Sequence, residues 1–571
     1  MTNNLINDPS PYLQQHKNNP VHWQTWTKKN LDLARNLQKP ILLSIGYASC
    51  HWCHVMAHES FEDLQTAELM NKFFFNIKVD REERPDIDFL FQSSFQLFNQ
   101  SGGGWPLTMF LDENAVPFMG GTYFPKTPQN GLPAFKEVLL KVSDAYKEQR
   151  EKIINQSDLI KKSLELKRNS VLDQDLEPIL DTVIDNLDPI NGGYKGAPKF
   201  PIFNVFDTFL YFFNKTKKEK FIKPVELILN QLCSKGIYDH VEGGIARYTV
   251  DENWTIPHFE KMFYDNSQFI LLLSKYCKIK PHDYFKKKII QTVSYFDNNF
   301  INQENKLYGS AFDADSEGEE GKYYTFNYQE IKNIKDIEKY FSIKSSGNWE
   351  GKIILTELKF PTSDIIKELK DIRKQKIKPF FDNKTQLDLN SLWISALVNA
   401  HAILPNEGYL AKAESIFDIL EEKFFNKKIY HSNLNSSSFL EDYAYSINCL
   451  IDLSEETLNP KYKIKANNLC KEVINNFYRK EKKIFQKNRL DCNDLFLNPI
   501  DISDHTIPNG NGIMLMNFTR LGFLKEAKEL SESLNGYLNI YKSFMISTVK
   551  SIDFFKEISK GKNCNEEGCA I

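Results

Sequence analysis

The chain has 571 residues, of which 41% are hydrophobic and 26% are charged, a balance typical of a globular protein rather than a disordered one. Its 72 basic and 75 acidic residues give a formal net charge of −3, without the basic excess that marks nucleic-acid binding. No run approaches the ~20 apolar residues of a membrane span. We therefore expect neither nucleic acid nor a membrane as a partner, and the length predicts two or more domains.

The first residues lack the basic and apolar regions of a signal peptide, which predicts a cytoplasmic location. Structural disulfides are rare in that compartment, so the nine cysteines do not form an obvious disulfide framework. Two close pairs stand out, Cys50 with Cys53 and Cys564 with Cys569. The other five are interpreted as buried thiols: Cys233, Cys277, Cys449, Cys470 and Cys492.

The beginning of the chain alternates predicted strands and helices. Apolar, aromatic and branched runs predict strands at 39–45, 73–79 and 106–111. Helical spacing of apolar residues predicts helices at 51–72 and 84–99. This alternation is typical of a sheet covered by helices, and it predicts an α/β domain.

From about residue 132 the pattern becomes helical. Apolar residues recur at helical spacing in seven long stretches: 132–167, 204–236, 267–300, 390–423, 439–453, 459–478 and 509–547. So many helices either stack as a solenoid or close into a toroid of helical hairpins. No repeat of fixed period is visible, which disfavours the solenoid.

A Cys-His-Trp-Cys motif occupies residues 50–53, between a predicted strand and a predicted helix. This is the context of a thioredoxin-like redox motif. A thiolate at a helix N-terminus faces unpaired N–H groups and the positive end of the helix dipole, which lowers its pKa below the free value of about 8.5. We expect Cys50, as the more exposed thiol, to attack a disulfide and Cys53 to resolve the intermediate.

Three further residues complete the predicted redox site. His51 and His54, when protonated, would favour the thiolate further. Trp105-Pro106 follows a glycine run and begins a predicted strand. Thioredoxin-like folds place a cis-proline at such a position beside the cysteines, so Pro106 is the candidate for that bond.

Other chemistry fits the same residues less well. Residues 50–54 match the attachment pattern of c-type haem, but a strand–helix junction is the wrong context for it. Cys50, Cys53, His54 and His58 could ligate zinc, although they crowd one short segment. The pair could also be buried without a role. The prediction retained is a redox pair with no metal and no cofactor.

A second group of polar and aromatic residues lies in the helical part. The candidate pocket residues are His240, Glu242, Arg247, Trp254, His258, Glu260, Asp265, Asp313, Asp315, Glu441 and Asp442. In a helical toroid such loops converge at one mouth, where aromatic rings beside carboxylates suit a sugar. Two carboxylates could hydrolyse a glycoside, and His240 with His258 could move a proton beside a carbonyl.

A structural interpretation of these residues remains open. Acids at helix starts are commonly caps, worth about 1 kcal/mol. Arg247 with Glu242 or Glu260 could simply hold loops together. An enzymatic activity would rest on analogy alone, because a fold does not determine a function.

Several motifs cover residues 1–125 almost without a gap, and thinner ones follow. They include Ser-Pro-Tyr-Leu at 10–13, Cys-His-Trp-Cys-His-Val-Met at 50–56, Ile-Lys-Val-Asp-Arg-Glu-Glu-Arg-Pro-Asp at 77–86, Gly-Gly-Trp-Pro at 103–106, Pro-His-Phe-Glu-Lys-Met at 257–262 and Leu-Glu-Asp-Tyr-Ala at 440–444. These motifs resemble the family of thioredoxin-domain proteins related to spermatogenesis-associated protein 20. The resemblance implies a thioredoxin-like domain followed by an (α/α)6 toroid like that of sugar 2-epimerases and many glycosidases.

The chain departs from these patterns at two places. Ser44 stands six residues before Cys50, where thioredoxin itself has a buried aspartate, so proton transfer would fall to His51, His54, Asp80 or water. Leu-Asn-Ser at 389–391 replaces the family's Trp-Asn-Gly. The pair Cys564 and Cys569 resembles one near the family's C-terminus and is either a second dithiol or a mobile tail.

The sequence thus predicts a thioredoxin-like domain at 1–130, a helical linker at 131–170 and a toroid at 171–571. The predicted function is thiol–disulfide exchange with a protein dithiol or disulfide, while the helical domain binds a partner, a glycan or another small molecule. The alternative is a carbohydrate-active enzyme, epimerase-like or glycosidase-like, whose thioredoxin-like domain is structural or regulatory. A third possibility is a redox-sensing binding protein without turnover.

Overall fold

The computed structural model describes residues 1–571 apart from 101, 130, 169–174, 426–427, 435–436, 562–563, 566–567 and 570–571. The chain divides into two compact units: Met1–Lys167 with Gln486–Ile500, and Arg168–Phe485 with Asp501–Ile571. The predicted domain boundaries at 130 and 170 stay predictions. In the described part of the chain, no helix combines the length and the apolar character that crossing a membrane requires.

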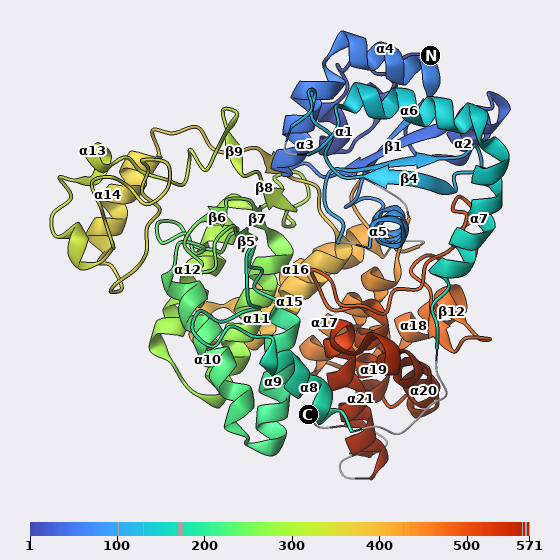
Figure 1. Cartoon of the computed structure of the whole chain (residues 1–571). Helices are drawn as coiled ribbons and strands as arrows, with labels where there is room; N and C mark the ends of the chain where they lie inside the picture. Colours follow the sequence, from blue (N-terminus) through green and yellow to red (C-terminus); the bar gives the residue numbers. More distant parts are fainter. Residues whose placement is uncertain are drawn as a thin grey trace. The chain divides into compact units, whose positions relative to one another are not determined.

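The first unit is a four-stranded sheet with helices on both faces (Figure 1). Its strands are β1 (Ile41–Gly46), β2 (Phe75–Asp80), β3 (Leu107–Leu111) and β4 (Pro117–Gly121). Its helices are α1 (Pro11–Gln15), α2 (Lys28–Asn36), α3 (His51–Met56), α4 (Leu64–Phe73), α5 (Pro85–Asn99), α6 (Phe135–Glu148) and α7 (Arg150–Leu164). Figure 1 shows α5 on one face of the sheet, and α4 and α6 on the other.

The strand order is β2-β1-β3-β4. β1 pairs with β2 in parallel, whereas β3 is antiparallel to both β1 and β4. The parallel pairing sets Ser44 opposite Lys78 and Gly46 opposite Asp80. With helices on both faces, this is a thioredoxin-like arrangement.

Alternation of side chains gives the two faces of this sheet different chemistry. Ile41, Leu43 and Ile45 point into an apolar core shared with α2 and α5. Ser44 and Lys78, at intervening positions, therefore lie on the opposite face. The face with the polar positions is the one where the chain also carries the cysteine motif.

The late segment Gln486–Ile500 completes the first unit. Leu495 and Phe496 pack against its apolar core, and the Phe496 ring lies 6.0 Å from that of Phe91. Arg84 pairs with Asp494 at 3.0 Å. Sequence analysis assigned this segment to the helical part, because a contact across some 400 residues leaves no local pattern.

Two local features of the first unit differ from prediction. The helix expected at 51–72 is interrupted: α3 continues into a π-helical turn, Ala57–Phe61, and α4 then begins anew. Asp63 causes the restart, because its side chain accepts from the Thr66 N–H and caps α4. The second difference is β4, a strand that was not among those predicted.

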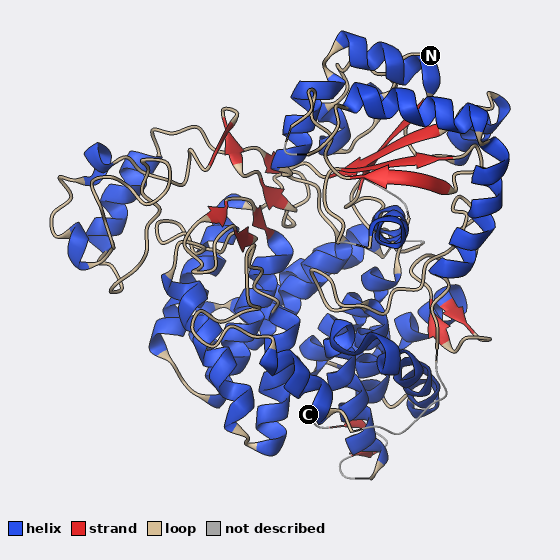
Figure 2. Ribbon diagram, viewed as in Figure 1, coloured by secondary structure: helices blue, strands red, loops and turns tan. Residues whose placement is uncertain are grey.

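The second unit is mainly helical (Figure 2). Its helices are α8 (Glu177–Asp185), α9 (Phe203–Thr216), α10 (Glu219–Ser234), α11 (Phe263–Ile279), α12 (Asp283–Asn299), α13 (Tyr328–Ile331), α14 (Ser363–Arg373), α15 (Leu387–His401), α16 (Tyr409–Phe424), α17 (Leu440–Thr457), α18 (Pro460–Phe477), α19 (Gly510–Leu521), α20 (Leu524–Tyr541) and α21 (Ile546–Ser559). Its two-residue strands are β5 (Tyr248–Thr249), β6 (Pro257–His258), β7 (Lys261–Met262), β8 (Ala311–Phe312), β9 (Asp315–Ser316), β10 (Glu319–Glu320), β11 (Phe381–Asp382), β12 (Tyr478–Arg479), β13 (Ile484–Phe485), β14 (Cys564–Asn565) and β15 (Gly568–Cys569).

Helices α9, α11, α15, α17, α19 and α21 form a closed ring, in which each packs against the next and α21 packs against α9. Other helices lie outside it, α10 on α9, α12 on α11, α16 on α15, α18 on α17 and α20 on α19. The described helices therefore close into the predicted (α/α)6 toroid rather than an open solenoid. The fold class, an α/β thioredoxin-like unit followed by a mostly α toroid, is confirmed.

The N-terminal ends of neighbouring ring helices lie together. β7, β8 and β11 form one small sheet directly before α11 and α15. The Leu387 N–H at the start of α15 donates to the His431 carbonyl, and His431 contacts Asp442 in the first turn of α17. Tyr445 in α17 donates to the Pro508 carbonyl just before α19. The acids in these first turns therefore lie at one end of the ring.

Candidate functional site

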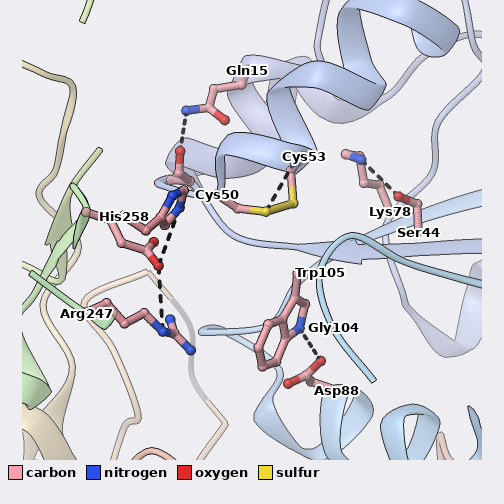
Figure 3. Close-up of a disulfide and its surroundings, with 12 residues drawn as sticks. Gln15, Ser44, Cys50, Cys53, Lys78, Asp88, Gly104, Trp105, Arg247 and His258 are labelled. Atoms are coloured by element: carbon pink, nitrogen blue, oxygen red, sulfur yellow. Dashed lines mark hydrogen bonds and ion pairs between the residues drawn. A yellow bond between two sulfur atoms is a disulfide. The ribbon is translucent and has the colours of Figure 1, made fainter. Parts of the chain in front are cut away.

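Cys50 and Cys53 are joined by a disulfide at the start of α3 (Figure 3). Their Cα atoms lie 5.2 Å apart, an ordinary separation for a disulfide. Cys50 is the N-cap of α3, and its Sγ accepts from the Cys53 N–H at 3.2 Å. Cys50 is 3% exposed and Cys53 is 2% exposed, so both thiols are buried and exposure hardly distinguishes them. The assignment of Cys50 as the attacking thiol stays a prediction.

The loop that carries Pro106 is tied to the turn before the cysteines. The Trp105–Pro106 bond is cis, as the position predicted. Trp105 Nε1 donates to Asp88 at 2.8 Å, and its ring meets the Tyr47 ring edge-on at 5.8 Å. The Arg81 guanidinium lies 3.9 Å above the Trp105 ring. These contacts fix the Pro106 loop relative to residue 47, three positions before Cys50.

Two buried bases lie on the cysteine side of the sheet, and sequence analysis missed both. Lys78 is 1% exposed, and its Nζ donates to Ser44 Oγ at 3.1 Å (Figure 3). Burial holds the pKa of Lys78 well below its ordinary value. Burial, followed by the charges of Lys78 and His54, likewise lowers the pKa of His16. Where thioredoxin has a buried carboxylate, this chain has a serine beside a buried amine.

The remaining predicted residues of the motif occupy the helix itself. His51 is the first residue of α3 and its ring packs edge-on against Trp52, while His54 lies one turn later. His58 forms an ion pair with Glu62 at 3.1 Å on an exposed surface. With Cys50 and Cys53 bonded to each other, the four residues of the zinc alternative do not form a ligand set in this form.

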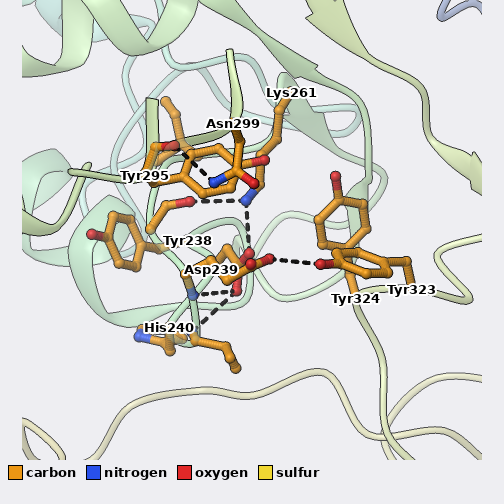
Figure 4. Close-up of polar contacts among 12 residues, drawn as sticks. Tyr238, Asp239, His240, Lys261, Tyr295, Asn299, Tyr323 and Tyr324 are labelled. Atoms are coloured by element: carbon orange, nitrogen blue, oxygen red, sulfur yellow. Dashed lines mark hydrogen bonds and ion pairs between the residues drawn. The ribbon is translucent and has the colours of Figure 1, made fainter. Parts of the chain in front are cut away.

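In the second unit, the predicted pocket residues fall into separate clusters. Glu242 belongs to an ion-pair network around Asp239, because Arg373 contacts both carboxylates. Figure 4 shows Asp239 with Lys261 and the neighbouring His240. Arg373 and Lys261 contact the Asp239 carboxylate at 2.8 and 2.7 Å and hold its pKa low, although burial opposes them. The cavity beside this network measures about 30 Å³, enough for water but not for a sugar.

His240 itself has fixed partners. Its Nδ1 lies 3.2 Å from Glu357, and its Nε2 lies 3.0 Å from the Lys235 carbonyl. Burial and the charge of Lys288 lower the pKa of His240, which keeps the ring neutral. These contacts tie the loop that carries His240 and Glu242 to Lys235, Glu357 and Arg373.

A second cluster joins three predicted residues. Arg247 Nε lies 3.6 Å from Glu260, and His258 Nε2 lies 3.9 Å from the same carboxylate (Figure 3). His258 Nδ1 also pairs with Glu320 at 2.6 Å. Burial lowers the pKa of His258, but the Glu320 hydrogen bond and the Glu260 charge outweigh it, so the pKa is raised. The Tyr248 ring stacks on His258 at 4.9 Å, so the expected aromatic ring and carboxylates do meet here.

A third cluster brings together the first turns of α15 and α17. His431 Nδ1 lies 2.8 Å from Asp442, and Gln386 Nε2 lies 3.3 Å from His431 Nε2. Asp388 lies beside them; the one hydrogen bond to its carboxylate among the described residues comes from the Leu389 N–H at 2.8 Å. Burial raises the pKa of Asp388 to about 7, the charge of Asp442 adds to this, and His431 opposes it.

Glu441 and Asp442 were predicted as pocket residues, whereas Asp388 and His431 were not. Asp388 looked like an ordinary helix-start acid, and His431 lies in a loop without a motif. The spacing of acids at successive helix starts was the available signal for Asp388. His431 offered none.

The other predicted pocket residues are placed as follows. Trp254 is buried, and its Nε1 donates to the Asn191 carbonyl at 2.8 Å, which ties two loops together. Asp265 lies in the first turn of α11. Asp313 accepts from the Asp315 N–H at 3.1 Å in the loop after β8. The side chains of Cys564 and Cys569 lie outside the described residues, although β14 and β15 set the two positions opposite each other.

Among the residues that the structure describes, two groups have the residue types for a metal ion. The Asp388, His431 and Asp442 ligand atoms lie within 4.8 Å of one another. In the other group, Asp86 and Asp494 are already neutralised by Arg84, at 2.7 and 3.0 Å. In the first group both His431 nitrogens already have partners, so hydrogen bonding accounts for that arrangement.

These features define a protein with a thioredoxin-like unit carrying a Cys-x-x-Cys pair, followed by a helical toroid. The family model Thioredox_DsbH, described as protein of unknown function DUF255, matches residues 2–165. An uncharacterised protein of Caenorhabditis elegans is 30% identical, covering 93% of this chain and 82% of its own. Human spermatogenesis-associated protein 20 is 30% identical, covering 79% of this chain and 67% of its own. The chain belongs to the family of spermatogenesis-associated protein 20 and its relatives.

Solved structures resemble the chain more distantly. Cellobiose 2-epimerase from Bacillus thermoamylovorans is 13% identical with a TM-score of 0.42, covering 68% of this chain and 87% of that one. The GH76A alpha-1,6-mannanase from Salegentibacter sp. is 11% identical with a TM-score of 0.38, covering 67% and 98%. The closure of the helical ring rests on its own helix contacts and not on these likenesses.

Proposed function

We propose that the protein is a thiol–disulfide oxidoreductase that uses the Cys50–Cys53 pair. The observation that carries this proposal is the disulfide across the first turn of α3, next to a loop with a cis Trp105–Pro106 bond. Cys50 would attack a protein disulfide, and Cys53 would release the partner. The helical unit would select a protein partner, a glycan or another small molecule.

The proposal includes a reducing compartment such as the cytoplasm. Five described cysteines carry no disulfide, four of them buried and one partly buried, which suits such a compartment. The redox pair would then be re-reduced after each turnover by a cellular dithiol.

The reduction potential of the Cys50/Cys53 pair tests the proposal. The full chain is equilibrated with reduced and oxidised glutathione, and its thiols are counted by mass after alkylation. We expect a reversible two-electron couple between about −270 and −120 mV, the range of thioredoxin-like oxidoreductases. A pair that never opens, or thiols that hold stoichiometric zinc instead, would contradict it.

A second candidate function is acid–base chemistry on a sugar by the helical unit, and the Asp388 cluster favours it. A carboxyl group with a pKa of about 7 stands beside a histidine held by Asp442, at the end of the ring where acids gather. Such a group can give or take a proton near neutral pH. The full chain, incubated with a panel of disaccharides and followed by NMR, should epimerise or cleave one, and Asp388→Asn should stop it. An unchanged panel would exclude this candidate for those sugars.

A further inference from the structure

The hydroxyl of Tyr12 is buried without a hydrogen-bond partner in the described part of the chain. Tyr12 lies in α1 and is 0% exposed. Its Oη is one of the buried polar atoms for which no donor or acceptor lies in reach. Burying an unsatisfied hydroxyl costs free energy, so phenylalanine at this position would give a more stable folded state. We therefore expect this hydroxyl to have a hydrogen-bond partner in another state of the molecule.

The unpartnered hydroxyl and the sulfur of Cys53 both lie next to Gly46, at the end of β1. A Cβ atom placed on Gly46 would lie 2.3 Å from Tyr12 Oη and 2.8 Å from Cys53 Sγ. Both atoms thus occupy the space that a side chain at position 46 would need. Glycine at this position permits the hydroxyl and the sulfur to approach each other.

The Tyr12 ring is held in place on its other sides. Lys78 Nζ lies 4.9 Å from the centre of the Tyr12 ring, and at 4.9 and 4.6 Å from the Trp23 and Phe61 rings. The His16 ring meets Tyr12 edge-on at 5.1 Å. A ring packed in this way keeps its hydroxyl directed at one place rather than turning it toward solvent.

The chemistry near Cys53 favours a hydroxyl that stays protonated. The charged or titratable groups around Tyr12 are His16, the C-cap of α1, and Lys78 and Asp80 from β2. Burial, followed by the charge of Asp80, raises the pKa of Tyr12. The phenol is therefore a hydrogen-bond donor at every physiological pH and never a competing anion.

We propose that the Tyr12 hydroxyl donates a hydrogen bond to the Cys53 thiolate in the reduced form of the protein. This inference rests on the proposed function and assigns the residue that replaces thioredoxin's buried carboxylate near the resolving cysteine. In the disulfide form the sulfur is a poor acceptor and the hydroxyl has no partner. In the dithiol form a thiolate offers a charged acceptor, and hydrogen bonds to charged groups are the stronger ones.

The step that Tyr12 assists is the release of the partner protein. Cys53 thiolate attacks Cys50 Sγ in the mixed disulfide, the Cys50–Cys53 bond forms, and the bond from Cys50 to the partner sulfur breaks. The pair is oxidised by two electrons, and the partner disulfide is reduced to a dithiol. The proton lost by Cys53 balances the proton taken up by the leaving sulfur.

Tyr12→Phe in the full chain tests the proposal through the reduction potential. At a pH above the Cys53 pKa, where the thiolate is the main reduced species, removing the donor should shift the equilibrium with glutathione about tenfold toward the disulfide, which equals about 30 mV. Tyr146→Phe is the matched control, because it also removes a buried hydroxyl of the first unit, one that donates to Glu113. The control should keep the wild-type potential.

A second measurement follows the pKa of Cys53 itself. In Cys50→Ser the resolving thiol is free, and its titration is read from thiolate absorbance after subtracting the Cys50→Ser/Cys53→Ser double variant. Adding Tyr12→Phe should raise the Cys53 pKa by about one unit, a tenfold change in acidity. Equal titration curves would overturn the proposal. A purely structural role for Tyr12 would not produce this shift.

Thermal unfolding of both redox forms guards against a folding artefact. The oxidised Tyr12→Phe protein should unfold no earlier than the oxidised wild type, since no hydrogen bond is lost in that form. The reduced variant should unfold earlier than the reduced wild type. If the wild-type pair shows no reversible couple, the proposed function fails; if the couple is reversible but Tyr12→Phe behaves like Tyr146→Phe, only this inference fails.

Discussion

In the first unit burial shifts the pKa of two bases on the cysteine side of the sheet, Lys78 and His16, whereas at the ring end of the second unit it shifts that of an acid, Asp388. Burial disfavours the charged form of both kinds. It therefore lowers the pKa of the bases and raises that of the acid. The same physical cause therefore acts on the pKa in opposite directions in the two units.

The largest expected effect separates the two units by chemistry. Cys50→Ser should abolish disulfide exchange in a protein-disulfide reduction assay, because the attacking sulfur is gone. Cys492→Ser is the matched control, since Cys492 is a thiol of the same unit that carries no disulfide. Residual exchange in Cys50→Ser would move the redox chemistry elsewhere. If Cys50→Ser kept full disulfide exchange but lost sugar chemistry, the proposed roles of the two units would be reversed.

The acid cluster should show itself in the pH dependence of stability. Because the folded-state pKa of Asp388 is raised to about 7, its contribution is full below about pH 4 and is lost as the pH rises through 7. Asp388→Asn should therefore be more stable than wild type above pH 7, by on the order of 3 kcal/mol, with no gain near pH 4.

Denaturant unfolding at several pH values measures this difference. Asp442→Asn is the contrasting variant, because Asp442 holds His431 and accepts from the Phe439 N–H. It should destabilise the protein by about 2 kcal/mol. If the two variants behaved alike, Asp388 would be an ordinary partnered acid.

For the buried base Lys78, the pH dependence of its contribution to stability should have the opposite sign. The folded-state pKa of Lys78 is lowered, so its contribution is full above the unfolded value of about 10.4 and is lost as the pH falls. Lys78→Met should stabilise the protein at pH 7 by about 2 kcal/mol, and the gain should shrink toward pH 10. Lys72→Met, at an exposed lysine, serves as the control. A gain that is constant with pH would point to packing instead of charge.

The smallest expected effect concerns the close approach at Gly46. Gly46→Ala should lower stability by about 1 kcal/mol, because the new methyl group meets Tyr12 Oη and Cys53 Sγ. Gly102→Ala is the control, since a Cβ there meets nothing within 4 Å. Equal melting temperatures for Gly46→Ala and Gly102→Ala would show that the packing around Gly46 is loose enough to accept a methyl group.

Much of the fold could be predicted because it rests on local patterns. The strand at 39–45, the cysteine turn and the helical stretches all follow from hydrophobic spacing and turn residues. Helix α21 was missed, since the predicted stretch ended at residue 547. It closes the ring and buries Ser547, Thr548 and Ser551 among its apolar residues, so it lacks the one-sided apolar stripe that periodicity detects.

The candidate sites also differ in how far local sequence patterns predict them. The cysteine pair was predictable because its chemistry depends on two residues three apart in a recognisable context. Tyr12 and Lys78 reach that site from α1 and β2, and their role depends on burial and on strand register, which no local motif carries. Asp388 and His431 are brought together by the ring contacts between α15 and the loop before α17. Such residues become visible only once the chain is folded.

The segment Gln486–Ile500 has a consequence for how the protein is made. Its Arg84–Asp494 pair and its Phe91–Phe496 contact belong to the thioredoxin-like unit, yet they come from near the end of the chain. A ribosome must therefore synthesise four of the six ring helices, α9, α11, α15 and α17, before the thioredoxin-like unit acquires its last core residues. The cysteines emerge early, but the unit around them can be completed only after much of the helical unit has been made.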